Sequence, residues 1–198
     1  HAEIRDLLFY CRSAFSFHDE LALRRIINTP RRGIAAATLS RLDEIAKTQN
    51  ISFFDAIKIE SQSETTSPAT RLKMAEFIEL LEKYHKRFMA KSEPLAQVVQ
   101  QFVEDIHYIA YLQSSSNSDE NAQRRRENVD EFVNAVAAYE RREGRDLFGF
   151  LQSVSLEPPQ KEEDENPDEV TLMTLHASKG LEFKAVFLVG CEENLLPH

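Results

Sequence analysis

A cluster of polar residues near the end of the chain has types and spacing suited to binding a ligand. The cluster consists of His176, Ser178, Lys179 and Glu182. It lies between two β-branched and apolar runs, residues 170–175 and 185–189, which are typical of neighbouring strands in an α/β sheet. Because α/β proteins place ligand contacts at turns after their strands, the pattern indicates a binding site. The alternative is a plain surface turn with His176 satisfied in the core.

Nucleotide hydrolysis by this chain alone has no support in the sequence. The pattern GxxxxGK[ST] does not occur, and no acidic strand of the Walker B type follows. Cys11 and Cys191 are the two cysteines, too few for a disulfide scaffold or a zinc site. The sequence therefore predicts no catalytic residue and no metal site here, and free thiols in a reducing compartment.

A second candidate site is the segment from Thr29 to Ile34. Its proline ends a short helix, because the residue before a proline is disfavoured in the α region. Gly33 then leads into a new helix whose first amides lack partners inside the helix. Such amides bind anions such as phosphate, and Arg31 and Arg32 add positive charge beside them. The alternative is an ordinary helix-turn-helix with solvated arginines.

The charge of the chain is unevenly distributed. Its 198 residues include 24 Lys+Arg and 33 Asp+Glu, a net charge of −9, which excludes indiscriminate nucleic-acid binding by the whole surface. Residues 1–58 hold 9 basic and 7 acidic residues, whereas residues 119–169 hold 7 and 15. The acidic excess thus lies outside the segment with the candidate turn. The run Arg124–Arg126 is either a second phosphate contact or, preferably, a solvated helix face paired with nearby acids.

Most of the chain is expected to be helical. Only 5 Gly and 7 Pro occur, and apolar residues recur at helical spacing, with Leu21 and Leu72 among them. Polar loops are expected at residues 61–68 and 113–121. The expected helices include residues 4–11, 21–27, one that starts after Gly33 and continues through Ala46, 53–59, 68–90, 94–106, 122–139 and 147–154. The fold class predicted is mainly α, followed by a short α/β strand-turn-strand tail.

The acidic, proline-containing stretch at residues 157–169 predicts a linker before that tail. No apolar run approaches the roughly 18 to 20 residues of a membrane span, and no leader pattern opens the chain. The chain begins without methionine inside an expected helix and ends just after the second apolar run. It is therefore expected to be a piece of a larger protein.

Three segments together resemble one known family. Residues 170–198, with the core HASKGLEF, closely resemble motif V of the UvrD/Rep/PcrA superfamily-1 DNA helicases, nearest to the Rep branch. Residues 24–39, RRIINTPRRGIAAATL, resemble the helix-turn-helix segment of that family with its NTP-x-R-GIG pattern. Residues 124–136, RRRENVDEFVNAV, are similar to its R-x-ENLEEL helix. Order and separation also fit, so the resemblance covers essentially the whole chain.

The resemblance implies a fold and an activity. Residues 1–165 would be the helical insertion called subdomain 2B, and residues 166–198 the start of the returning RecA-like domain 2A. The family uses ATP with Mg²⁺ to move 3′ to 5′ on single-stranded DNA and to separate the duplex ahead. The fragment alone is expected to be inactive and without cofactor, since the phosphate loop, the Mg²⁺-binding acid and the arginine finger lie outside it.

The resemblance also implies partners and a location. The helical part would bind duplex DNA and swivel to regulate unwinding, in contact with the rest of the motor. Replication or repair proteins are further candidate partners. The expected location is the bacterial cytoplasm, in association with the nucleoid.

Individual roles follow from the resemblance. Thr174 and His176 would contact single-stranded DNA, and an imidazole can stack on a base. Glu182 would accept a hydrogen bond from the ATP ribose, and Gly180 would let that turn close. For Thr174 the alternative is simple strand propensity. The implied duplex contacts, which grip the backbone without reading sequence, are Thr29, Arg31, Arg32, Gly33 and Ile34.

This chain departs from the family pattern at Ala35, where the second glycine of GIG is usual. The departure bears on how closely a phosphate can approach the turn. Two other functions stay open. One is a stand-alone helical protein-interaction module, which has no need for the polar set between the two strands. The other is a nuclease-fused helicase, for which the sequence has no nuclease signature.

Overall fold

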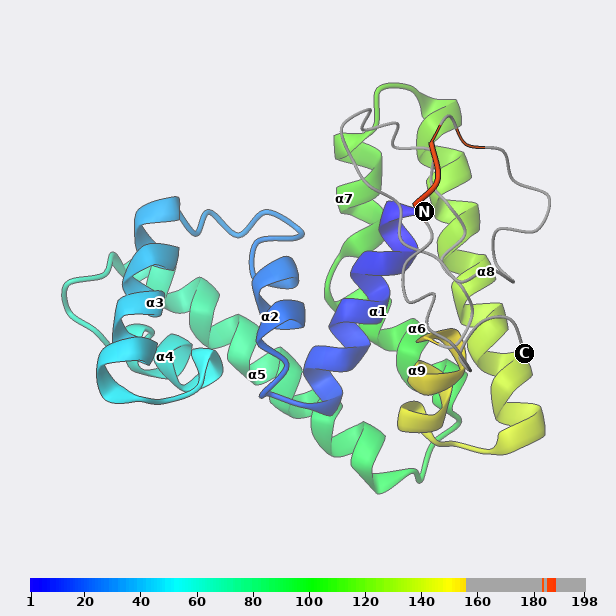
Figure 1. Cartoon of the computed structure of the whole chain (residues 1–198), viewed down its shortest axis with the longest axis horizontal. Helices are drawn as coiled ribbons and strands as arrows, with labels where there is room; N and C mark the ends of the chain where they lie inside the picture. The colour runs from blue at the N-terminus through cyan, green and yellow to red at the C-terminus, as the bar shows by residue number, and fades with distance from the viewer. Residues whose placement is uncertain (156–182, 184, 188–198) are drawn as a thin grey trace. The chain divides into compact units, whose positions relative to one another are not determined.

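The computed structural model describes residues 1–155, 183 and 185–187 (Figure 1). The chain divides into two compact units, His1–Gln160 and Lys161–His198. We call residues 1–155, the described part of the first, the helical unit. Residues 185–187 belong to the second expected strand, but in the structure they form neither a helix nor a strand. The remainder of the expected strand-turn-strand tail and the expected linker lie outside the described residues.

The helical unit consists of helices and short connections, which confirms the predicted mainly α class for this part of the chain. No strand occurs among the described residues. The helices are α1 (Ala2–Phe15), α2 (Glu20–Ile26), α3 (Ala36–Gln49), α4 (Phe53–Glu60), α5 (Pro68–Ala90), α6 (Leu95–Asp105), α7 (Tyr108–Ser115), α8 (Asp119–Glu143) and α9 (Leu147–Ser155). None of these helices is long and apolar enough to cross a membrane.

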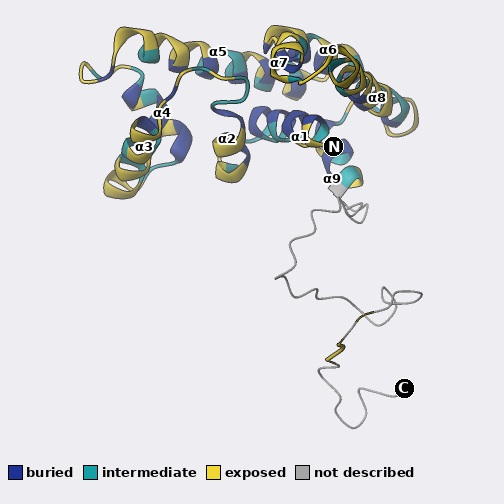
Figure 2. Ribbon diagram, turned by 90° about the horizontal axis from the view of Figure 1, so that it is seen from above, coloured by how far each residue is buried: buried dark blue, intermediate teal, exposed yellow. Residues whose placement is uncertain are grey.

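The helical unit contains two groups of helices, and helix α5 runs between them. Figure 1 shows it passing from the α3–α4 pair to the group formed by α1, α6, α7, α8 and α9, and α2 packs on both α1 and α4. The side of α5 that faces α4 and α1 is buried in Figure 2, while its opposite side is exposed. The buried stripe follows helical spacing, as expected for one apolar face: Met74, Phe77, Leu81, Tyr84 and Phe88.

Side-chain caps explain where several helices begin. The side chain of Asp19 accepts a hydrogen bond from the Ala22 amide at the start of α2. Serines do the same at the start of α4, α5 and α8: Ser52, Ser67 and Ser118. Each satisfies one of the amides that a helix leaves without an internal partner.

The expected loop at residues 113–121 was too long. Helix α7 continues through Ser115 and α8 begins at Asp119, so only residues 116–118 connect them. The serine-rich sequence disfavours a helix, but Tyr108 and Leu112 are buried on one face of α7. The Ser115 and Ser116 hydroxyls donate to the Leu112 carbonyl, which satisfies them within the helix end.

Leu21 and Leu72 were expected among the apolar positions, but both are exposed, at 66% and 57%. Their register explains the difference. Leu21 lies beside the buried face of α2, which Leu23 and Ile26 form, and Leu72 falls outside the spacing of the buried α5 stripe. Single exposed leucines are ordinary at protein surfaces.

An aromatic cluster forms the centre of the core. The Phe102 ring of α6 stacks on Tyr84 of α5 at a centroid distance of 4.1 Å. Tyr10 of α1 meets the same ring edge-on at 5.5 Å. All three side chains are buried, so this cluster holds α1, α5 and α6 together.

Asp146 predicts a measurable pH dependence of stability. An ion pair with Lys91 and a hydrogen bond from the Gly149 amide hold the pKa of Asp146 below its ordinary value. A lowered folded-state pKa stabilises the protein above the unfolded value of about 3.9, and this contribution is lost as the pH falls through the folded value. Asp146→Asn should therefore lower the melting temperature at neutral pH by a few degrees at most, because the carboxylate is partly exposed.

A thermal series over pH checks this prediction. The difference between wild type and Asp146→Asn should shrink as the pH falls through the lowered folded-state pKa of Asp146, and it should disappear below that pKa, where the carboxyl is protonated in the folded and the unfolded state alike. A difference that persisted unchanged in acid would contradict the role given to the charge.

Candidate nucleic-acid interface

The Asn28 side chain spans the turn between α2 and α3, residues 28–34, with two hydrogen bonds. The Asn28 Oδ1 accepts a hydrogen bond from the Arg32 amide at 2.8 Å, and its Nδ2 donates to the Ile34 carbonyl at 3.2 Å. Gly33 has a φ of +72°, a conformation that favours glycine. Asn28 and Gly33 thus both contribute to the shape of this turn, which we call the α2–α3 turn.

The Arg32 guanidinium points into the protein. Its Nη1 donates to the Ile26 and Ile27 carbonyls at 2.9 and 3.2 Å, at the end of α2, and lies within 3.4 Å of the Thr29 and Pro30 oxygens. Its Nη2 donates to the Tyr10 hydroxyl at 2.5 Å. The guanidinium also lies over the Phe77 ring at 4.8 Å. Among these contacts, the Ile26 and Ile27 carbonyls belong to the end of α2, where a helix leaves carbonyls without partners inside the helix.

The other predicted duplex contacts differ in exposure. Arg31 and Gly33 are exposed, and within the described part of the chain the Arg31 side chain forms no hydrogen bond or ion pair. The Ile34 side chain is buried in the core at 2% exposure, so only its backbone remains for a contact. Thr29 is half-buried, and its carbonyl accepts a hydrogen bond from the Tyr10 hydroxyl at 2.5 Å.

The start of α3 lies directly after this turn. Ala35 is its N-cap and supplies no side-chain hydrogen bond, and Ala35, Ala36 and Ala37 are all exposed. Small side chains leave the first amides of the helix accessible to an anion. Ala35 has φ −72° and ψ 157°, an ordinary extended conformation, so its backbone does not require the glycine that is usual in the family pattern.

Neighbouring arginines on α2 are already paired. Arg24 forms ion pairs with Glu20 and Asp43, and Arg25 forms one with the buried Asp6 at 2.9 Å. Of the four arginines on α2 and in the α2–α3 turn, Arg31 is therefore the one whose side chain has no hydrogen bond or ion pair among the described residues.

The arginine run on α8 is divided in its contacts. Arg125 pairs with the buried Glu3 at 3.5 Å and donates to the Ser115 hydroxyl at 3.1 Å. Arg124 and Arg126 are exposed. Of the two interpretations of this run, a phosphate contact or pairing with nearby acids, the pairing applies to Arg125.

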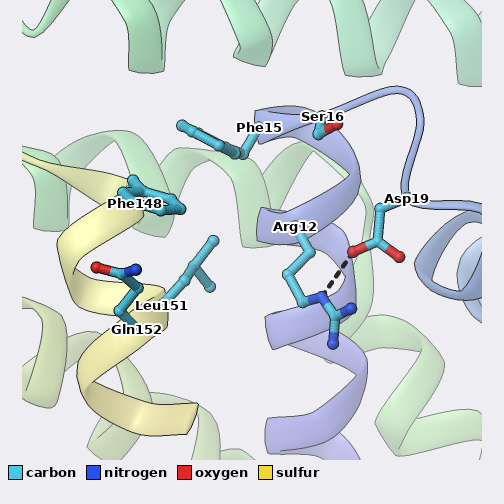
Figure 3. A pocket seen from close by; sticks show the side chains of 7 residues that line it. All are labelled: Arg12, Phe15, Ser16, Asp19, Phe148, Leu151 and Gln152. Atoms are coloured by element: carbon cyan, nitrogen blue, oxygen red, sulfur yellow. Dashed lines mark hydrogen bonds and ion pairs between the residues drawn. The ribbon is translucent and has the colours of Figure 1, made fainter. Parts of the chain in front are cut away.

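A cavity of about 460 Å³ lies elsewhere, between the end of α1 and α9 (Figure 3). The Phe15 and Phe148 rings stack there at 5.3 Å, and Arg12 pairs with Asp19 at 2.7 Å. The two charged groups that line the cavity, Arg12 and Asp19, are thus paired with each other. The lining residues are Arg12, Phe15, Ser16, Asp19, Phe148, Leu151 and Gln152.

The candidate contacts in the tail lie outside the described residues, and their roles stay predictions: Thr174, His176, Gly180 and Glu182. Among the described residues, no group of three or more His, Cys, Asp or Glu could hold a metal ion. Sequence reasoning missed Asn28 and Tyr10, which shape the α2–α3 turn. An Asn before Thr-Pro is a typical turn signal, whereas nothing local marks Tyr10.

Gly33→Ala tests the conformation of the turn. We expect this change to lower the free energy of unfolding by about 1 kcal/mol, because a Cβ is disfavoured at positive φ. No atom lies within 4 Å of the added Cβ, so the cost is conformational rather than steric. Urea denaturation measures the effect, and Gly33→Asn should cost less because Asn tolerates this conformation. Equal stability of wild type and Gly33→Ala would contradict the assigned turn.

The whole chain is similar in sequence to known proteins. The family model described as "UvrD-like helicase C-terminal domain" matches residues 1–198. A "Probable DNA helicase II homolog" of Rickettsia felis is 38% identical over 198 residues, which cover 98% of this chain and 29% of the relative. The "ATP-dependent DNA helicase PcrA" of Bacillus subtilis is 32% identical over 203 residues, covering 99% and 27%. The chain thus spans less than a third of the length of these relatives.

Proposed function

Because the chain belongs to the family of UvrD-like helicase C-terminal domains, we propose that it is part of an ATP-dependent DNA helicase. The observation that carries this proposal is the family match over the whole chain. The similarity to relatives named as DNA helicases supports it. In the proposed division, residues 1–165 form the helical 2B subdomain, and residues 166–198 begin the 2A motor domain.

The helical part binds the backbone of duplex DNA through the α2–α3 turn. Arg31 supplies the positive charge, and the exposed amides at the start of α3 supply hydrogen-bond donors for a phosphate oxygen. Gly33 and the exposed alanines at residues 35–37 present little bulk between these donors and the DNA. Contacts of this kind go to phosphates, so they hold the duplex without reading its sequence.

The tail contributes to the motor. Thr174 and His176 contact the single strand, and Glu182 accepts a hydrogen bond from the ATP ribose across the turn that Gly180 closes. ATP and Mg²⁺ would be held mainly by parts of the helicase outside this chain, since the sequence has no phosphate loop. The fragment alone is accordingly proposed to be inactive, with DNA and the rest of the motor as its partners.

A split between two activities tests the proposal in the longer protein that contains this chain. Arg31→Gln should slow strand separation several-fold, because it removes one phosphate contact to the duplex ahead of the fork. It should leave ATP hydrolysis stimulated by single-stranded DNA unchanged, because the turn does not touch that strand. Arg142→Gln is the matched control, since Arg142 is an exposed arginine at the far end of α8. Equal loss of both activities in Arg31→Gln would contradict this division of labour.

A further inference from the structure

Two adjacent arginines in the α2–α3 turn have opposite surroundings. Arg32 is half-buried, and its guanidinium reaches backbone carbonyls at the end of α2 and at the start of the turn, together with the Tyr10 hydroxyl. Arg31 is exposed, and within the described residues its side chain has no hydrogen bond or ion pair. The hydrogen bonds of Arg32 involve Nη1 and Nη2, so the protein itself holds the Arg32 guanidinium in an inward orientation.

The contacts of Arg32 join three parts of the helical unit. Tyr10 lies on α1, Phe77 on α5, and the accepting carbonyls of Ile26 and Ile27 at the end of α2. Tyr10 connects to the turn a second time, since its hydroxyl donates to the Thr29 carbonyl. Burial raises the pKa of Tyr10, although Arg32 opposes this, so the hydroxyl keeps the proton that it donates.

We propose that Arg32 is a positioning residue that fixes the α2–α3 turn, and that Arg31 is the arginine of this pair that meets the DNA phosphate. The assignment of Arg31 rests on the function proposed above, whereas the anchoring by Arg32 is a property of the folded chain. The planar fork of arginine suits the task, because it can donate to several carbonyls and stack on a ring at once. A lysine ammonium supplies charge at one point and cannot do both.

Paired lysine and glutamine substitutions separate the two roles. The measurement is binding of the 198-residue chain to a fluorescently labelled blunt DNA duplex over a salt series. Arg31→Gln should weaken binding about tenfold at low salt and reduce the slope of log affinity against log salt by about 1. Arg31→Lys should restore most of the affinity, because a point charge suffices at a phosphate contact.

At position 32, unlike position 31, a lysine should not restore duplex binding. Arg32→Lys is expected to weaken binding nearly as much as Arg32→Gln, because either change releases the turn. The double variant Arg31→Gln with Arg32→Lys should bind about as weakly as Arg32→Lys alone, because a displaced turn no longer presents Arg31. Binding at the wild-type level by Arg32→Lys would overturn the proposal, and additive losses would do the same. Arg142→Gln is the matched control for the loss of one exposed charge.

A second readout does not depend on DNA. In amide NMR spectra of the free chain, Arg32→Lys and the milder Tyr10→Phe should shift the resonances of Gly33 and Ile34, while Arg31→Gln should leave Ile34 unchanged. Unmoved Gly33 and Ile34 resonances in both Arg32→Lys and Tyr10→Phe would overturn the anchoring role even if no duplex were bound. If wild type bound no duplex but these resonances moved, the proposed function would fail and the anchoring by Arg32 would stand. Tyr10→Phe keeps the test valid if the Arg32 variants do not fold.

Discussion

Replacing Phe102 by alanine is expected to lower the free energy of unfolding of the helical unit by about 4 kcal/mol. The side chain is 2% exposed and touches Tyr10, Tyr84 and Phe88. Its removal leaves a cavity between α1, α5 and α6, and the aromatic contacts are lost with it. Urea denaturation followed by far-ultraviolet circular dichroism measures the change.

The Phe102→Ala protein that remains folded should also bind duplex DNA more weakly than wild type. Tyr10 loses its edge-on contact, and Tyr10 is the residue whose hydroxyl holds Thr29 and Arg32 in place. Phe148→Ala is the matched control, because its ring is 46% exposed and its loss should cost about 1 kcal/mol. Equal costs for the two variants would contradict the core described for α1, α5 and α6.

Replacing Asp6 by alanine is expected to cost about 2 kcal/mol. This carboxylate is buried at 5% exposure. It accepts hydrogen bonds from Arg25 of α2 and from the hydroxyl of Tyr108 of α7, both at 2.9 Å. Without Asp6 the buried Tyr108 hydroxyl loses its acceptor, which carries most of the cost, whereas Arg25 is 45% exposed and loses its counter-charge in contact with water.

A surface pair provides the control for Asp6. Asp43 pairs with Arg24, but its side chain is 48% exposed. Asp43→Ala should therefore cost less than about 0.5 kcal/mol in the same urea experiment. If Asp6→Ala were as mild as Asp43→Ala, Asp6 would not be the link between α1, α2 and α7 that its contacts indicate.

Local patterns in the sequence predicted much of the helical framework. The expected helix at residues 68–90 has the bounds of α5, because Ser67 followed by Pro68 marks a helix start and the apolar spacing continues to Phe88. The end of α2 was placed correctly for a related reason, since Pro30 limits the residues before it. Helix α7 was not predicted, because serines disfavour a helix and the sequence alone does not show that Tyr108 and Leu112 are buried on one face.

The candidate site was predictable in part. The sequence locates the turn and its two arginines, but it does not distinguish them, because both are charged and adjacent. What separates them is Tyr10, which is 22 residues away from Arg32 in the chain and meets it only in the folded structure. A contact of this range depends on the packing of α1 against α2 and α5, which local propensity does not specify.

The most direct test of the central proposal is an amide NMR map of the 198-residue chain titrated with an unlabelled DNA duplex at low salt. We predict that the largest shifts fall on Arg31, Gly33 and the first amides of α3, at residues 35–37, and that they weaken as salt is added. Amides around Arg142 at the end of α8 should not move. Shifts centred away from the α2–α3 turn, or none at low salt, would contradict the proposal that this turn holds duplex DNA.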